Sequence, residues 1–212
     1  MDNEKRFLRF DGRLWEDMTF EPIPGWETER VAHRPNEGDG TYRLELRSDE
    51  NEVLTFVSPL VDFTSGCPSK SDAMRWVRVG AYVPFHPEAC RLLFRRGDRE
   101  LYEADVADEP PQIRIDDVSR QKEGRVRLHW TAEASGDRPL TFNVAYVVDG
   151  ERGFSLARGL EETGYLVDLD PLPGSPEAQL GVLATDGVRS ASAISDPFEV
   201  AEKPPRLWIQ SP

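Results

Sequence analysis

The sequence has few of the residues from which most catalytic and metal sites are built. Its 212 residues include two cysteines and three histidines, and His33, His86 and His129 do not stand at the spacing of a zinc motif. It also has no Gly-x-Ser-x-Gly elbow, no phosphate-binding glycine loop and no dinucleotide fingerprint. The sequence therefore predicts no catalytic residues, no metal and no cofactor.

The two cysteines, Cys67 and Cys90, could form one disulfide or remain free thiols. The strand expected between them, from Met74 to Pro84, would span about 30 Å at roughly 3.3 Å per residue. Its ends are too far apart to bridge unless a flanking loop folds back. Cys90 also fits an inward-facing set with Leu92 and Phe94, where a thiol behaves as a small apolar side chain. We favour free thiols.

Since Cys67 lies in a loop with no helix N-terminus after it to lower the thiol pKa, we do not expect it to be a nucleophile.

Long apolar runs and an excess of basic charge are absent as well. No stretch approaches the roughly 18 apolar residues that cross a bilayer, and residues 1–6 lack the apolar core of a secretory signal. The chain has 39 acidic and 26 basic residues, with a formal net charge of −13. This charge opposes approach to nucleic-acid phosphates or to an anionic membrane. We therefore expect neither nucleic-acid binding nor membrane insertion, and the oligomeric state stays open.

What the sequence does contain is a series of short alternating runs in its C-terminal half. In the run from Val126 to Trp130, apolar residues alternate with Arg127 and His129, which is the pattern of a half-buried strand. The run 140–148 repeats the pattern and ends at Asp149-Gly150, a dipeptide suited to a tight hairpin. Counting similar runs to residue 200, about seven short strands fall in about ninety residues, which is the spacing of an immunoglobulin-like sandwich.

These runs resemble fibronectin type III and related bacterial immunoglobulin-like domains. The resemblance rests on Leu128-x-Trp130, on Leu140-x-Phe142-x-Val144-x-Tyr146, and on Val182-x-Ala184-Thr185-Asp186-Gly187 followed by Ser190-Ala191-Ser192. Fibronectin-type domains usually carry a tyrosine corner before the penultimate strand, and residues 172–178 contain no tyrosine. The resemblance thus implies a fibronectin-like or immunoglobulin-like sandwich in the looser sense.

The N-terminal half shows the same alternation. Residues 7–14 read as a first strand with Asp11-Gly12 as a kink or turn, and 41–47 place Tyr42, Leu44 and Leu46 on one face with charges on the other. Residues 107–111 end in a double proline that makes a short stiff linker. We therefore predict an all-β fold of two β-sandwich domains in tandem: residues 1–108, residues 109–203, and residues 204–212 as an extension or the start of a further strand.

The order of features along the chain looks like that of the paired sandwiches at the C-terminal end of some large bacterial extracellular proteins, including peptidase-associated ones. In such proteins the pair is an appendage to a catalytic or adhesive region. The resemblance implies an extracellular or cell-surface location and no active site in this chain.

Trp76 and Tyr82 are the candidate ligand-binding residues. They alternate with an apolar face made of Val77, Val79, Ala81 and Val83. Aromatic side chains on a sheet face can stack on sugars or anchor a protein partner, although they can also pack under a loop or a neighbouring domain. The acidic candidates lack the spaced oxygen ligands of a calcium loop, so we interpret them as solvated surface; they are Asp62, Asp116, Asp117, Asp168 and Asp170.

Three hypotheses follow. The favoured one is a non-catalytic accessory module that spaces or docks a larger bacterial extracellular protein. The alternative is a carbohydrate- or protein-binding module that uses Trp76 and Tyr82, which an exposed aromatic strip would support. The third is a small hydrolase with an unrecognised site, which would require two carboxylates at catalytic separation or Cys67 beside a histidine.

Overall fold

The structure is a computed structural model that describes residues 6–29, 38–63, 75–148, 150 and 152–202. In these residues all regular structure is β, in antiparallel sheets, which confirms the all-β prediction. No helix in this part of the chain is long and apolar enough to cross a membrane. The chain divides into two compact units: Met1–Gln112 with Ala134–Leu140 and Thr185–Ala191, and Ile113–Glu133 with Thr141–Ala184 and Ser192–Pro212.

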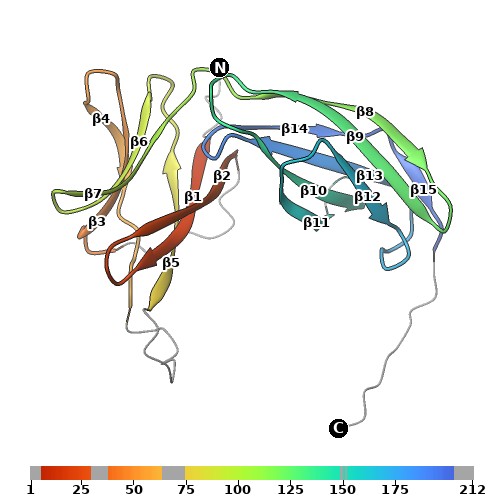
Figure 1. Ribbon diagram of the computed structural model, residues 1–212, viewed down its shortest axis with the longest axis horizontal. Helices are drawn as coiled ribbons and strands as arrows, with labels where there is room; N and C mark the ends of the chain where they lie inside the picture. Colours follow the sequence, from red (N-terminus) through yellow and green to blue (C-terminus); the bar gives the residue numbers. More distant parts are fainter. Residues whose placement is uncertain (1–5, 30–37, 64–74, 149, 151, 203–212) are drawn as a thin grey trace, which may run out of the picture. The chain divides into compact units, whose positions relative to one another are not determined.

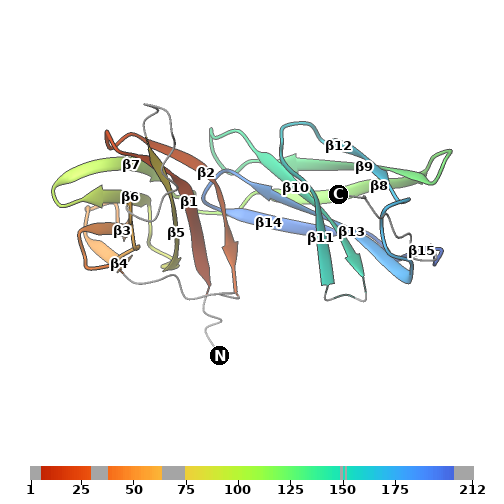
Figure 2. The same ribbon diagram turned by 90° about the horizontal axis from the view of Figure 1, so that it is seen from below.

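The first unit contains a three-stranded and a four-stranded sheet (Figure 1). The three-stranded sheet has the order β2-β1-β5, with β1 at Phe7–Trp15, β2 at Phe20–Thr28 and β5 at Trp76–Pro84. The four-stranded sheet has the order β4-β3-β6-β7, with β3 at Tyr42–Arg47, β4 at Val53–Val57, β6 at Arg91–Arg96 and β7 at Arg99–Asp105. Figure 2 shows the two sheets as separate layers.

The core of this unit lies between the two sheets. Inward-facing side chains of several strands meet there, so that Leu8 and Leu14 of β1 join Leu44 of β3 and Phe94 of β6 in one cluster. Phe10 stacks on Phe20 at 5.1 Å between ring centroids. Burial of each such side chain contributes roughly 1.5–3 kcal/mol, which makes this cluster the main source of stability of the unit.

The sequence predicted a kink or turn at Asp11-Gly12, and a turn is excluded because β1 continues through these residues. β1 pairs with β5 residue by residue from Phe7 to Trp15, without interruption. Gly12 serves packing instead, because a Cβ atom at this position would lie 2.0 Å from the ring of Phe20 on the neighbouring strand. The only irregularity of β1 is a register shift against β2 between Arg9 and Asp11.

The segment Thr185–Ala191 belongs to the first unit through a set of polar contacts. The Thr185 hydroxyl donates to the Gly25 carbonyl at 2.5 Å, and the Gly25 N–H donates to the Gly187 carbonyl at 3.0 Å. Arg189 is buried and pairs with Glu27 at 2.5 Å, while its guanidinium also donates to the carbonyl of Ala107. A buried arginine is tolerated here because its donors find acceptors.

The second unit also contains two antiparallel sheets. One has the order β12-β9-β8, with β8 at Gln112–Arg120, β9 at Arg125–Glu133 and β12 at Gly164–Asp168. The other has the order β11-β10-β13-β14, with β10 at Thr141–Val148, β11 at Arg152–Leu160, β13 at Ser175–Thr185, β14 at Ser190–Ile194, and β15 at Phe198–Val200 beside β13.

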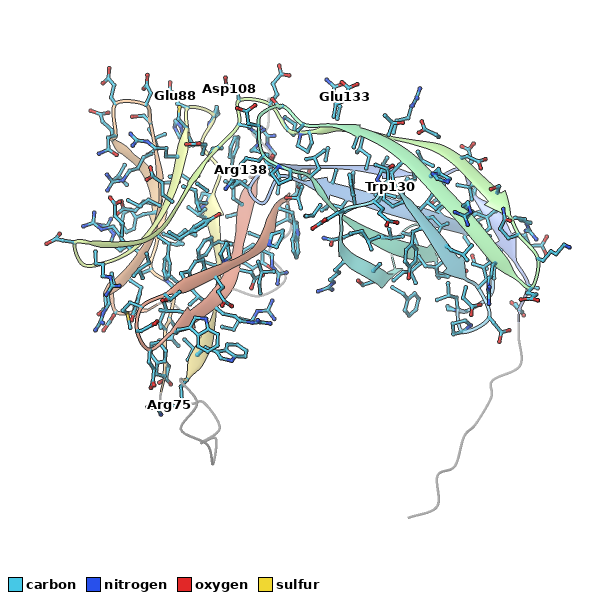
Figure 3. All side chains as sticks on the ribbon, viewed as in Figure 1. Arg75, Glu88, Asp108, Trp130, Glu133 and Arg138 are labelled. Carbon is cyan, nitrogen blue, oxygen red and sulfur yellow. The ribbon has the colours of Figure 1, made fainter. Side chains whose placement is uncertain are left out.

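The alternation read from the sequence describes the core of the second unit correctly. Val126, Leu128 and Trp130 are buried, and Trp130 packs edge-on against Phe142 at 5.3 Å. Trp130 is labelled in Figure 3. The predicted turn at Asp186-Gly187 is present, with Gly187 at a φ of 96°. Asp149 and the extension 204–212 lie outside the described residues.

Tyr146 takes over the function that a tyrosine corner would have. Its side chain comes from β10 and is completely buried, and its hydroxyl donates to the carbonyl of Pro173 at 2.7 Å. Burial raises the pKa of this phenol, which keeps the hydroxyl protonated as a donor. The connection between β12 and β13 is thus tied to the core by a tyrosine from another strand.

We expect Tyr146→Phe to lower the free energy of unfolding by about 1–2 kcal/mol, because the variant loses the hydrogen bond that the buried Tyr146 side chain makes to the Pro173 carbonyl. Urea denaturation followed by tryptophan fluorescence measures this difference. The control is Tyr165→Phe on β12, where the described residues give the hydroxyl no hydrogen-bond partner. Equal losses in both variants would contradict the role assigned to Tyr146.

Candidate functional site

The outer face of the sheet β2-β1-β5 gathers arginine and aromatic side chains. The residues of β1 that alternate with buried Leu8, Phe10 and Leu14 point away from the core. β2 and β5 place further residues directly opposite them. We call this surface the arginine–aromatic face; its members are Arg9, Asp11, Arg13, Trp15, Trp26, Trp76, Arg78 and Tyr82.

Arg9 lies between two aromatic rings. It is directly opposite Trp26 on β2 and Tyr82 on β5, and its guanidinium carbon is 4.3 Å and 5.7 Å from the two ring centroids. Its Nη1 also approaches the Tyr82 hydroxyl at 3.4 Å. Each cation–π contact at a partly exposed site contributes about 0.5–1 kcal/mol, so the three side chains hold one another in place.

Trp76 lies at the other end of the face. Its ring centroid is 6.4 Å from that of Trp15, directly opposite on β1, and the Arg13 guanidinium carbon is 5.2 Å away. Trp76 nevertheless remains 47% exposed. It is therefore the ring on this face that an incoming partner can reach most readily.

Asp11 is the anion that organises the arginines. Although it is on the outer face, it is only 4% exposed, because Arg9 donates to Oδ2 at 2.5 Å and Arg78 donates to Oδ1 at 3.0 Å. Gly80, opposite on β5, leaves room for this carboxylate, since a Cβ atom there would lie 3.2 Å from Oδ1. Charge-assisted hydrogen bonds of this kind are about twice as strong as neutral ones.

The structure brings the two sequence-predicted residues, Trp76 and Tyr82, onto one face of β5, opposite buried Val79 and Val83. Their binding of a ligand stays a prediction. Sequence reasoning gave no site role to Arg9, Asp11, Arg13, Trp15, Trp26 and Arg78. The alternation of β1 contained the first four, but only the pairing of β1 with β2 and β5 shows which residues become neighbours.

The four-stranded sheet of this unit has a similar cluster on its own outer face, in which arginine side chains surround a buried carboxylate. Glu45 of β3 is completely buried, beneath Arg47 at 2.5 Å, Arg43 at 3.5 Å and Arg95 at 4.0 Å. Arg43 also lies over the ring of Phe56, 4.0 Å from its centroid. A carboxylate without exposure is stable there only because several guanidinium groups surround it.

The histidines and cysteines are not assembled into a reactive centre in the described residues. His86 accepts a hydrogen bond from the Glu88 N–H at 3.3 Å, and His129 of β9 packs against Gly164. Cys90 is a free thiol and half-buried, as predicted. His33 and Cys67 lie outside the described residues.

The acidic candidates include four with interaction partners, namely Asp62, Asp116, Asp168 and Asp170. Asp116 pairs with Arg114 at 2.9 Å and accepts from the Thr131 hydroxyl, and Asp168 accepts from the Asp170 N–H at 2.9 Å. Among the described residues, no three histidine, cysteine or acidic side chains come close enough to hold a metal ion.

The shifted pKa values belong to turns and to the core rather than to the arginine–aromatic face. The pKa of Asp17 is lowered by hydrogen bonds from the backbone N–H and hydroxyl of Thr19. The pKa of Asp39 is lowered by the hydroxyl and backbone N–H of Thr41. Hydrogen bonds to the ionised form explain both directions. Both aspartates are exposed, and each accepts a hydrogen bond from the backbone N–H of the threonine two residues later.

No protein-family model matches the chain, and a search of curated proteins gives no match. The functional inference therefore depends on the side-chain arrangement itself.

We expect Asp11→Asn to destabilise the first unit by about 1–3 kcal/mol, because two guanidinium groups lose their shared anion and Arg9 is only partly solvated. Urea unfolding measures the loss, and the emission of Trp26 should change as Arg9 leaves its ring. The matched control is Asp98→Asn, whose carboxylate pairs with Arg95 in full exposure and should give no measurable change. An unchanged midpoint for Asp11→Asn would show that Asp11 does not organise this face.

Proposed function

We propose that this chain is a non-catalytic accessory module that docks against a protein surface through the arginine–aromatic face of its first unit. The observation that supports it most directly is the composition of that face. Arginine, tryptophan and tyrosine are the residues enriched at the centres of protein interfaces. Here they are fixed by Asp11 and by one another before any partner arrives, which reduces the entropy lost on binding.

A carbohydrate-binding role is the second candidate, and the exposed ring of Trp76 favours it. Sugar stacking needs a free ring face. The rings of Trp26 and Tyr82 each have Arg9 over them, and Arg13 lies over Trp76. These contacts favour a protein surface over a sugar.

For the second unit we propose a fibronectin-like sandwich within a tandem of residues 1–108 and 109–203. Its first, second and fifth strands, β8, β9 and β12, form one sheet, while β10, β13 and β14 belong to the other. In the constant-type immunoglobulin fold, the fourth strand joins the sheet of the first two. Here the fourth strand, β11, pairs with β10, which supports the fibronectin-like label.

The resemblance to appendages of large bacterial extracellular proteins suggests the context of this module, as part of a larger protein of that kind. In that setting, catalysis or adhesion is performed by another region, and the tandem spaces it or docks it. An extracellular or cell-surface location is part of this proposal. The net charge of −13 fits a partner surface other than nucleic acid or anionic lipid.

A photo-crosslinking experiment tests the docking face. The full chain carrying Trp76→p-benzoylphenylalanine is expressed in its native cells and irradiated, and adducts are identified by mass spectrometry. We expect one recurrent protein partner. The control is the same residue at Leu166, which is 40% exposed on β12 of the second unit. Adducts that are the same from both positions would contradict the proposal.

Retention in polysaccharide gels tests the carbohydrate alternative. We expect the migration of the wild-type chain to be unaffected by the polysaccharide. Retention that disappears in Trp76→Ala would instead assign this face to a sugar ligand.

A further inference from the structure

β5 is an edge strand of the sheet β2-β1-β5. Its hydrogen bonds to β1 show which of its backbone groups point toward β1 and which point away. The Phe85 N–H donates to the Arg6 carbonyl, and the Glu16 N–H donates to the Arg75 carbonyl. In an antiparallel pair, backbone groups alternate between the two sides of the strand. The odd-numbered residues of β5 therefore turn their backbone groups toward β1, and the even-numbered residues turn theirs away.

A contact at the end of β5 agrees with this assignment. The Pro84 carbonyl accepts from the hydroxyl of Thr55 on β4, on the side away from β1. Within the described residues, β5 pairs with no strand other than β1. In the part of the chain that the structure describes, the outward N–H and C=O groups of Arg78, Gly80 and Tyr82 therefore have no strand partner, while β4 reaches the edge at Pro84.

The two edges of this sheet differ in where their prolines lie. β2 contains Pro22 and Pro24, which cannot donate to a new ladder. β5 has one proline, at its last residue Pro84, and a single charged residue, Arg78. Proteins usually blunt an exposed edge with proline or several charges, so an unprotected one of this length is suited to strand addition.

The sequence of β5 is complementary to itself in one antiparallel register. If a two-fold axis passes through Gly80, Arg78 stands opposite Tyr82 of the second copy on the outer face. This is the pair that the chain already makes between β1 and β5, where Arg9 stands opposite Tyr82 with its guanidinium 5.7 Å from the ring. Gly80 adds no side chain at the axis. A register shifted so that Arg78 faces itself would instead place two cations together.

We propose that a second copy of this chain pairs antiparallel along β5, with Gly80 on the two-fold axis, and joins two three-stranded sheets into one. The arginine–aromatic face then continues across the axis. This inference rests on backbone geometry and not on the docking function. The contact is small, so association is weak, and the charge of −13 on each copy makes it stronger at high salt, where repulsion is screened.

Disulfide trapping tests the register. In the full chain with Cys67→Ser and Cys90→Ser, Gly80→Cys should form a disulfide-linked dimer under mild oxidation, since directly opposed hydrogen-bonded residues lie about 5.5 Å apart. Arg78→Cys and Tyr82→Cys, each alone, should not link to themselves, but a mixture of the two should give the heterodimer. Absence of both the Gly80→Cys dimer and the heterodimer of Arg78→Cys with Tyr82→Cys, or efficient linking of Arg78→Cys to itself, would overturn the proposal.

Sedimentation equilibrium tests association without cysteines. We expect the dimer fraction of the wild-type chain to rise between about 10 µM and 1 mM, and to be higher at 0.5 M than at about 0.05 M salt. Arg78→Glu should weaken association at least about tenfold, and Arg78→Lys should weaken it less. Both variants should fold, because Asp11 still accepts its hydrogen bond from Arg9. Far-UV circular dichroism checks that they do. A wild-type chain that stays monomeric throughout overturns the inference.

Discussion

The pairing of guanidinium groups with buried carboxylates on the outer faces of the sheets determines what the first unit can do. The two-residue period of a strand fills the core with one set of side chains and leaves the other set to solvent. Asp11 and Glu45 belong to the outer set and are nevertheless buried, because the arginines beside them close over them. Each face thereby becomes a fixed array of cations and rings rather than a set of mobile side chains.

This constraint explains why the favoured function is contact rather than chemistry. A general acid or base needs a pKa shifted toward neutral pH and access to a substrate. Among the described residues, the shifted groups are Asp17 and Asp39, which are exposed and bonded to Thr19 and Thr41, and Tyr146, which is buried in the core. Asp11 and Glu45 are covered by the groups that neutralise them. Arginine stacked on tryptophan or tyrosine, in contrast, is the composition that protein interfaces use.

Much of the fold could be predicted because alternation is a local property. The inward set of β5 and the buried Leu128 and Trp130 of β9 could be read directly from the residue order. Only part of the site could be predicted. Alternation along one strand indicates which face of the sheet a side chain lies on, but it does not indicate which residue of the next strand lies beside it. Trp26 meets Arg9 only through the pairing of β2 with β1, and Gly12 seemed to mark a turn because its true partner, Phe20, lies across a strand pair. Likewise, the missing tyrosine corner gave no hint that Tyr146 would reach Pro173 from β10.

The two edges of the sheet β2-β1-β5 differ in a way that bears on its function. Prolines on β2 prevent addition of a strand next to Trp26, so a partner on that side must approach the face with its side chains. β5 presents donors and acceptors beside Arg78 and Tyr82, so a partner there can use its backbone and its side chains together. Because Asp11 already fixes Arg78, the same carboxylate supports both proposals, the docking face and the pairing with a second copy. The two proposed surfaces therefore share one buried anion.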